Sequence, residues 1–162
     1  MRNYLQIILS KKFLIIMGRS EEEKKMKIVY AYVCGDILHE GHLLALENAK
    51  ELGDKLIVGV LTDKAIMEKK PKPTISFDER IRLIKSFKCV DCVVPQDDYS
   101  PINNLRAIQP DIHMESTSHI GNPYLKQLRK VFKGRIIMMP YYPEKSSTKI
   151  KESIRNSEGG IK

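Results

Sequence analysis

Short apolar runs alternate with amphipathic segments along the chain from residue 27 onward. The apolar runs are rich in β-branched residues, as in buried strands, whereas the amphipathic segments place apolar residues at helical spacing. Strands are expected at 27–34, 55–61, 90–94, 111–114 and 135–139, and helices at 41–52, 63–70, 77–87, 101–108, 124–132 and 147–154. This alternation predicts an α/β fold with a Rossmann-like, doubly wound parallel sheet in three α/β/α layers.

In such sheets a ligand binds beyond the carboxyl ends of the strands. Functional residues are therefore expected just after Cys34, Leu61, Met114 and Met139. A local signal supports one of the helix boundaries, because Ser76 and Glu79 have the spacing of a capping box at the start of helix 77–87.

Length and charge narrow the class of protein. A chain of 162 residues, 42% hydrophobic and 30% charged, is typical of one folded domain. The net charge is +8, but residues 1–27 hold seven basic and three acidic side chains, and so half of the excess lies in the first sixth. The remainder is mildly basic and lacks interleaved aromatic and basic residues. We therefore expect a small anionic ligand and no nucleic-acid partner.

The N-terminal segment differs from the rest of the chain. It contains two apolar runs separated by Lys11 and Lys12, both too short to cross a bilayer, and no small-residue cleavage site follows them. We expect a cytoplasmic protein without a membrane partner, with an extension at 1–26, one domain at 27–156 and a tail at 157–162. Whether the extension is a flexible arm, a packing helix or the product of an upstream start codon stays open.

Cysteine usage gives no sign of a disulfide framework or a metal site. The chain has three cysteines, and Cys89 and Cys92 are placed so that an extended strand would point them to opposite faces. No second pair completes a zinc site. We expect these cysteines to be small buried apolar side chains and the protein itself to hold no metal.

The segment after the first expected strand concentrates chemical groups at a strand-to-helix turn. It reads Gly35-Asp36-Ile37-Leu38-His39-Glu40-Gly41-His42 and contains two of the chain's four histidines. Gly41 lets an anion approach the backbone, and a helix N-terminus offers unpaired N–H groups. His39 and His42 can donate to phosphate oxygens and stabilise developing charge. The pattern favours a phosphate site over the alternatives of structural histidines or a zinc pair.

The His39-Glu40-Gly41-His42 stretch resembles the HxGH signature of the nucleotidyltransferase superfamily, which includes cytidylyltransferases and adenylyltransferases. Three further stretches, in the same order as in the family, extend the resemblance over residues 27 to about 155. Gly59 to Ile66 is similar to the cytidylyltransferase domains of phosphonate biosynthesis, and Phe77 to Arg80 to a family helix with a single arginine. Ser146 to Ile150 resembles the end of the R-T-E-G-I-S-T-T signature of glycerol-3-phosphate cytidylyltransferase.

The resemblance implies the nucleotidyltransferase fold, a homodimer and transfer of CMP from CTP to a phosphate or phosphonate oxygen with release of pyrophosphate. His39 and His42 would contact the triphosphate, and Lys69, Lys70 or Lys72 would neutralise its charge. The nucleotide would lie against Val33, Cys34, Gly35, Asp36, Gly41, Ser146, Ser147 and Thr148, and the second substrate against Asp63, Arg80, Tyr141 and Lys145. Mg²⁺ is expected with CTP through few protein ligands.

Several of these positions also have a purely structural interpretation. The hydroxyls of Ser146 to Thr148 could donate to phosphate from a helix start, or one of them could simply cap that helix. Arg80 could pair with phosphate or form an exposed salt bridge on its helix. Asp36 could orient a ligand or cap the turn.

Three departures from the family pattern bear on the substrates. Tyr141 replaces the signature arginine, and Lys145 stands where isoleucine is usual. Residues 116–119, Ser-Thr-Ser-His, replace G-D-D-W after the fourth strand, and residues 33–36, Val-Cys-Gly-Asp, replace G-T-F-D. We expect the catalytic step to survive these changes, which concern the second substrate and the choice between CTP and ATP.

The sequence therefore leaves three hypotheses for the function. The leading hypothesis is a cytidylyltransferase acting on 2-hydroxyethylphosphonate, 2-aminoethylphosphonate, glycerol 3-phosphate or phosphoethanolamine. The alternative in the same class is an ATP-dependent adenylyltransferase of the FMN-to-FAD type. The alternative from another class is a non-catalytic nucleotide-binding protein, which the altered 116–119 segment suggests.

Overall fold

The computed structural model describes residues 25–140, 142 and 146–158. In chain order the strands are β1 (Ile28–Val33), β2 (Lys55–Leu61), β3 (Cys92–Gln96), β4 (Ile112–Ser116) and β5 (Arg135–Met139). The helices are α2 (Glu40–Lys50), α3 (Asp63–Met67), α4 (Phe77–Lys85), α5 (Ile102–Ile108), α6 (Pro123–Val131) and α7 (Ser147–Glu158), with a 3₁₀ turn η1 (Thr117–His119).

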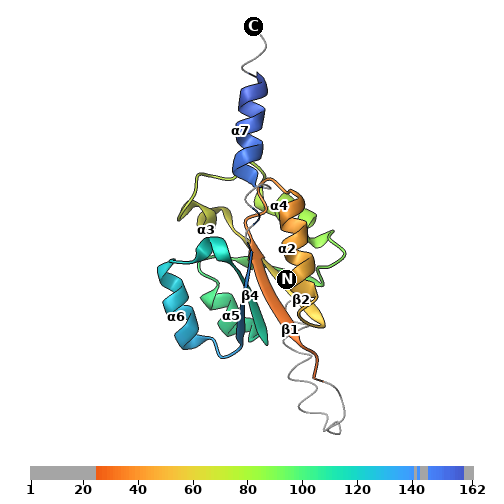
Figure 1. Cartoon of the computed structure of the whole chain (residues 1–162), viewed down its shortest axis with the longest axis vertical. Coiled ribbons are helices and arrows are strands. Elements are labelled where there is room, and N and C mark those ends of the chain that lie inside the picture. The colour runs from red at the N-terminus through yellow and green to blue at the C-terminus, as the bar shows by residue number, and fades with distance from the viewer. Residues whose placement is uncertain (1–24, 141, 143–145, 159–162) are drawn as a thin grey trace.

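The strands form one parallel sheet in the order β3-β2-β1-β4-β5, between two layers of helices (Figure 1). Alternate residues of β1 point to opposite faces of the sheet and pack against the two helix layers. Val29 and Ala31 pack in the core under α2 and α4, whereas Ile28 and Tyr30 pack in the core under α5 and α6. The predicted three-layer α/β fold is confirmed.

The boundaries of β3 and β4 differ from the predictions, and the difference at β3 has a physical reason. β3 begins at Cys92, after Cys89, and continues through Pro95 instead of ending before it. Proline has no N–H to give to a sheet, but β3 is an edge strand and pairs only with β2, which makes Pro95 tolerable there. β4 likewise runs two residues further than the expected 111–114, to Ser116.

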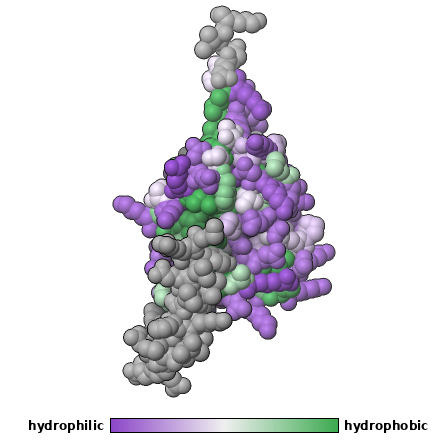
Figure 2. All heavy atoms as spheres, turned by 180° about the vertical axis from the view of Figure 1, so that it is seen from behind, coloured by the Kyte–Doolittle hydropathy of each residue, from purple (hydrophilic) through white to green (hydrophobic). Residues whose placement is uncertain are grey.

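The ends of the chain are described only in part. Helix α7 continues to Glu158, beyond the expected end at residue 154 and into the predicted tail. It projects from the body of the domain (Figure 1), and an apolar band leads down from it on the opposite side of the molecule (Figure 2). Residues 1–24, most of the predicted extension, lie outside the described residues. Within the described part of the chain, no helix is long and apolar enough to cross a membrane.

The direction of winding reverses at β1, which pairs with β2 on one side and with β4 on the other. The carboxyl ends of β1 and β4 therefore form the switch point at which ligands bind in open α/β sheets. Gly35 follows β1 with a φ of +72°, a left-handed conformation that favours glycine. It turns the chain sharply at the edge of the sheet where the site is expected.

Arg80 ties the carboxyl ends of two strands together. Its side chain is 0% exposed, and Nη1 donates to the carbonyl oxygens of Cys34 and Leu61, both at 2.6 Å. Nε donates to the carbonyl oxygen of Ile75 at 3.1 Å, and Nη2 to the Asp63 carboxylate at 2.6 Å. The interpretation of Arg80 as an exposed salt bridge is therefore wrong, because the ion pair with Asp63 has a fully buried guanidinium. The contact of Arg80 with a substrate phosphate stays a prediction.

Replacing Arg80 with methionine leaves four acceptors without their donor in a buried position. We expect Arg80→Met to lower the free energy of unfolding by about 3 kcal/mol, the scale for losing one partner of a buried ion pair. Arg82→Met, on the exposed side of the same helix, is the control and should change stability by less than about 0.5 kcal/mol. Equal denaturant midpoints for the two variants would contradict the role given to Arg80.

Candidate active site

The two histidines of the HxGH sequence lie side by side at the N-terminus of α2. His39 is the N-cap, and its Nδ1 accepts a hydrogen bond from the N–H of Gly41 at 3.1 Å. The ring centroids of His39 and His42 are 4.0 Å apart. Sequence and fold thus place two imidazoles and a helix N-terminus together just beyond β1.

Within the described part of the chain, the buried side-chain polar atom that is left without a partner belongs to His42. Its Nδ1 is buried and has no hydrogen bond among the described residues. Burial, and then the neighbouring charges of His39 and Lys70, lower the pKa of His42 to about 4. The ring is therefore neutral at pH 7 in the free protein, and an anionic ligand beside it would favour its charged form.

Three lysines are candidates for neutralising the charge of the triphosphate. Lys69, Lys70 and Lys72 are all exposed, on the segment after α3, which ends at Met67 and not at residue 70 as expected. The charge of Lys70 contributes to the lowered pKa of His42. This electrostatic coupling singles out Lys70 as the lysine associated with the histidine pair.

Asp36 joins three segments of the site. Its Oδ1 accepts the N–H groups of Thr74 at 2.6 Å and Ile75 at 3.0 Å, and its Oδ2 pairs with Lys151 of α7 at 2.7 Å. Burial alone would raise the pKa of Asp36, but the hydrogen bonds from Lys151 and the two N–H groups hold it below its ordinary value. The expectation that Asp36 caps its own turn is therefore corrected, because the carboxylate caps the loop before α4.

The serine cluster lies against the HxGH turn. Ser146 is buried and its Oγ accepts the N–H of Lys149 at 3.3 Å, so that the interpretation of this residue as a helix cap is confirmed. Ser147 Oγ donates to the carbonyl oxygen of Ile37 at 3.0 Å, and Thr148 is exposed. The start of α7 and the turn after β1 are thereby brought together.

Of the other predicted site residues, some lie within the described part of the chain and two do not. Val33, Cys34 and Gly35 end β1 and begin the turn, where the resemblance placed the nucleotide. Asp63 begins α3 and is engaged by Arg80. The remaining two, Tyr141 and Lys145, lie outside the described residues.

Among the described residues no three His, Cys, Asp or Glu side chains are grouped to hold a metal ion. The residues present thus provide no cage for the expected Mg²⁺, which prefers several oxygen ligands and readily takes them from phosphates and water.

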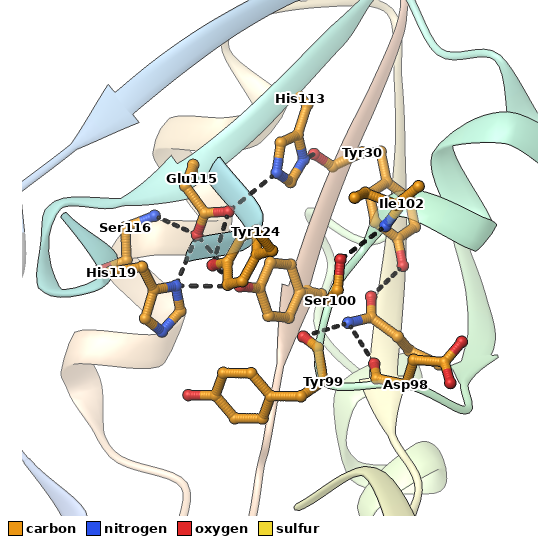
Figure 3. Close-up of polar contacts among 12 residues, drawn as sticks. Tyr30, Asp98, Tyr99, Ser100, Ile102, His113, Glu115, Ser116, His119 and Tyr124 are labelled. Atoms are coloured by element: carbon orange, nitrogen blue, oxygen red, sulfur yellow. Dashed lines mark hydrogen bonds and ion pairs between the residues drawn. The ribbon is translucent and has the colours of Figure 1, made fainter. Parts of the chain in front are cut away.

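Sequence reasoning missed a buried polar cluster at the carboxyl end of β4 (Figure 3). Glu115 is fully buried, and its carboxylate accepts from His119 Nδ1 at 2.6 Å and lies 3.2 Å from His113 Nε2. The hydroxyls of Tyr32 and Tyr124 each lie 3.2 Å from it. Burial would raise the pKa of Glu115, but the hydrogen bonds from His113 and His119 lower it to about 2.

The signal for this cluster was present in the sequence. His113 and Glu115 are two residues apart in a strand, and so they share one face of β4, with Met114 on the other. Two polar side chains facing the same core layer require each other as partners. The partner His119, in η1, could be placed only once the path of the chain after β4 was known.

A comparison with known proteins identifies the family. Residues 32–153 match the sequence model of the family described as cytidylyltransferase-like. The chain belongs to this family, part of the HxGH nucleotidyltransferase superfamily.

Curated relatives and solved structures extend this finding. The bifunctional protein HldE of Helicobacter pylori (strain Shi470) is 37% identical over 115 residues, covering 67% of this chain and 25% of the relative. The bifunctional protein HldE of Geotalea uraniireducens (strain Rf4) is 29% identical over 147 residues, covering 89% of this chain and 30% of the relative. The chain thus spans between a quarter and a third of the length of these relatives.

A lipopolysaccharide core biosynthesis protein from Thermoplasma volcanium GSS1 superposes with a TM-score of 0.66 at 26% identity, over 72% of this chain and 98% of the other. A pantoate-beta-alanine ligase from Francisella tularensis superposes with a TM-score of 0.56 at 20% identity, over 88% of this chain and 70% of the other. The first likeness covers nearly the whole of a solved protein, and the second shows the shared fold.

The lowered pKa of His42 can be tested by NMR titration of its ring. We expect a midpoint of about 4. Lys70→Met should raise this midpoint, because a positive charge that disfavours the imidazolium is removed. Lys69→Met is the control and should leave it unchanged. A wild-type midpoint near the ordinary 6.5 would contradict the buried, unpartnered environment described for His42.

Proposed function

We propose that the protein is a nucleotidyltransferase that transfers a nucleoside monophosphate to a phosphate oxygen of a small acceptor and releases pyrophosphate. The observation that carries this proposal is the buried, unpartnered Nδ1 of His42 beside His39 at the N-terminus of α2. An unpaired buried polar group costs about 1–3 kcal/mol, which a ligand can offset by pairing with it. Membership of the cytidylyltransferase-like family supports the same reaction.

The proposed step forms one bond and breaks one. An acceptor phosphate oxygen attacks the α-phosphorus of the nucleotide, and the bond from the α-phosphorus to the bridging oxygen breaks, with its electron pair leaving on pyrophosphate. His39 and His42 donate hydrogen bonds to phosphate oxygens, and Lys70 stabilises the charge that grows on the leaving group. The protein contributes positioning and charge stabilisation and forms no covalent bond itself.

ATP replaces CTP as the nucleotide in this proposal, which makes the protein an adenylyltransferase. The relatives reported above are named HldE and not cytidylyltransferases. The chain also departs from the glycerol-3-phosphate cytidylyltransferase pattern at residues 116–119, Tyr141 and Lys145. These departures weaken the argument for CTP as the nucleotide.

A sugar 1-phosphate is the acceptor class that we propose, in place of a phosphonate or FMN. One solved relative is a lipopolysaccharide core biosynthesis protein. The core of a lipopolysaccharide is an oligosaccharide, and oligosaccharides are assembled from nucleotide-activated sugars. Such donors are made by the reaction proposed here, with a sugar 1-phosphate as the attacking phosphate.

A matrix of nucleotides and acceptors tests the proposal by pyrophosphate release. ATP and CTP are each combined with sugar 1-phosphates of five to seven carbons, glycerol 3-phosphate, 2-aminoethylphosphonate, 2-hydroxyethylphosphonate, phosphoethanolamine and FMN. We expect kcat/KM for ATP with one of the sugar 1-phosphates to exceed that of every CTP pair at least tenfold. Higher activity with CTP and a phosphonate would restore the first hypothesis, and nucleotide binding without any pyrophosphate would favour the non-catalytic alternative.

The role of His42 is tested on the pair that the matrix selects. His42→Ala should reduce kcat/KM by about 10²-fold or more, the scale for losing one electrostatic donor to a developing negative charge. Glu47→Ala, an exposed residue of the same helix, is the control and should stay within twofold of the wild type. Unchanged turnover in the His42 variant would remove it from the catalytic assignment.

A further inference from the structure

The Glu115 carboxylate is the most densely hydrogen-bonded side chain at the switch point, and the mechanism above does not use it. In addition to the two histidines and two tyrosines, it accepts the N–H of Ser116 at 3.0 Å. A carboxylate with that many partners is rigid, and it fixes the groups around it. Of its two histidine partners, the one that reaches the surface is His119, whose side chain is 20% exposed, against 0% for His113.

The orientation of His119 follows from this contact. Its Nδ1 lies 2.6 Å from the Glu115 carboxylate and 3.0 Å from the Tyr32 hydroxyl, so the proton of a neutral ring is placed on Nδ1. The other ring nitrogen points away from Glu115 (Figure 3) and has no hydrogen bond among the described residues. Nε2 is then the ring nitrogen presented at the carboxyl edge of the sheet, where it can hydrogen-bond to a ligand.

Three aromatic rings hold this imidazole in place. The ring centroid of His119 lies 5.8 Å from that of Tyr32, in a stacked arrangement, and 6.1 Å and 6.4 Å from those of Tyr99 and Tyr124. The same tyrosines pack with Cys34 at the end of β1 and with the apolar face of α3. His119 is therefore fixed within a wall that joins the segment after β4 to the end of β1 and to α3.

We propose that His119, held by Glu115, recognises a hydroxyl group of the acceptor, so that His119 is a binding residue and Glu115 its positioning residue. This inference rests on the function proposed above. The reacting phosphate lies with His39 and His42 after β1, and so a side chain after β4 meets the part of the acceptor that does not react. The buried charge of Glu115 behind the ring disfavours an anion there and suits a neutral hydroxyl.

The nucleotide is assigned to the other side of the site. The start of α7, with Ser147 bonded to Ile37, belongs to the side of the HxGH turn and α2. His119 instead lies among residues of α6, the loop before α5 and the segment that packs on α3. The two ligands would thus approach the reacting phosphorus from the two sides of the switch point.

His119→Asn separates the two ring nitrogens. The asparagine amide keeps a donor near the place of Nδ1, so the contact with Glu115 is retained, but nothing remains at the place of Nε2. With ATP and the sugar 1-phosphate selected in the matrix, we expect the KM for the sugar phosphate to rise about tenfold, on the scale of one lost hydrogen bond. The KM for ATP and the melting temperature should stay close to the wild-type values.

Two further variants complete the test. Glu115→Gln should raise the same acceptor KM, because His119 loses its charged partner, while leaving the affinity for a non-hydrolysable ATP analogue unchanged by calorimetry. Ile120→Ala, an exposed side chain one residue beyond His119, is the matched control and should match the wild type.

The outcomes separate this inference from the proposed function. An unchanged acceptor KM in His119→Asn, in an enzyme that turns over, overturns the inference and leaves the function intact. A loss of ATP-analogue affinity in His119→Asn also overturns it, because His119 would then belong to the nucleotide side. If the wild type binds the ATP analogue but releases no pyrophosphate with any acceptor, the proposed function fails, and the acceptor role of His119 fails with it.

Discussion

The buried guanidinium of Arg80 is the interaction on which the site depends. Parallel strands end in carbonyl groups with no neighbouring N–H at that edge, and the carbonyls of Cys34 and Leu61 find their donor in this one side chain. Because the same guanidinium also binds the Asp63 carboxylate and the Ile75 carbonyl, it joins β1, β2, α3 and the loop before α4. Asp36 extends this framework to α7 through Lys151. The histidine pair thus lies beside strands, helices and loops that these hydrogen bonds hold in fixed positions relative to one another.

The buried polar groups at the switch point are of two kinds, those with hydrogen-bond partners in the protein and those without. Arg80, Asp36 and Glu115 are charged, buried and surrounded by partners, as buried charges must be if the fold is to be stable. His42 Nδ1 is buried and has none among the described residues, and its neutral state reduces the cost of that burial. The satisfied groups hold the shape of the site, and the unsatisfied one is available to a ligand.

The sequence predicted the fold almost completely, because apolar periodicity and turn residues report directly on strands and helices. It also located the HxGH turn and the start of α7, because each is a short continuous stretch of sequence, and the structure brings the two together in space. What it could not assign were roles that depend on burial. Arg80 occupies a position typical of an exposed helix arginine, and only the packing of α4 against the sheet buries it. His119 looked like part of a degraded motif until the path of η1 brought it onto Glu115.

The positive charge of the chain has a local meaning in this structure. Lys70 acts on His42, and Lys151 is neutralised by Asp36, so two lysines that look equivalent in sequence have opposite roles. A lysine paired with a carboxylate stabilises the fold, and its charge is largely cancelled for a ligand. An exposed lysine beside a neutral histidine instead adds positive electrostatic potential where a triphosphate would lie. The negative charge of an incoming anion would favour protonation of His42. The site would become more positive as the nucleotide arrives, when electrostatic stabilisation is required.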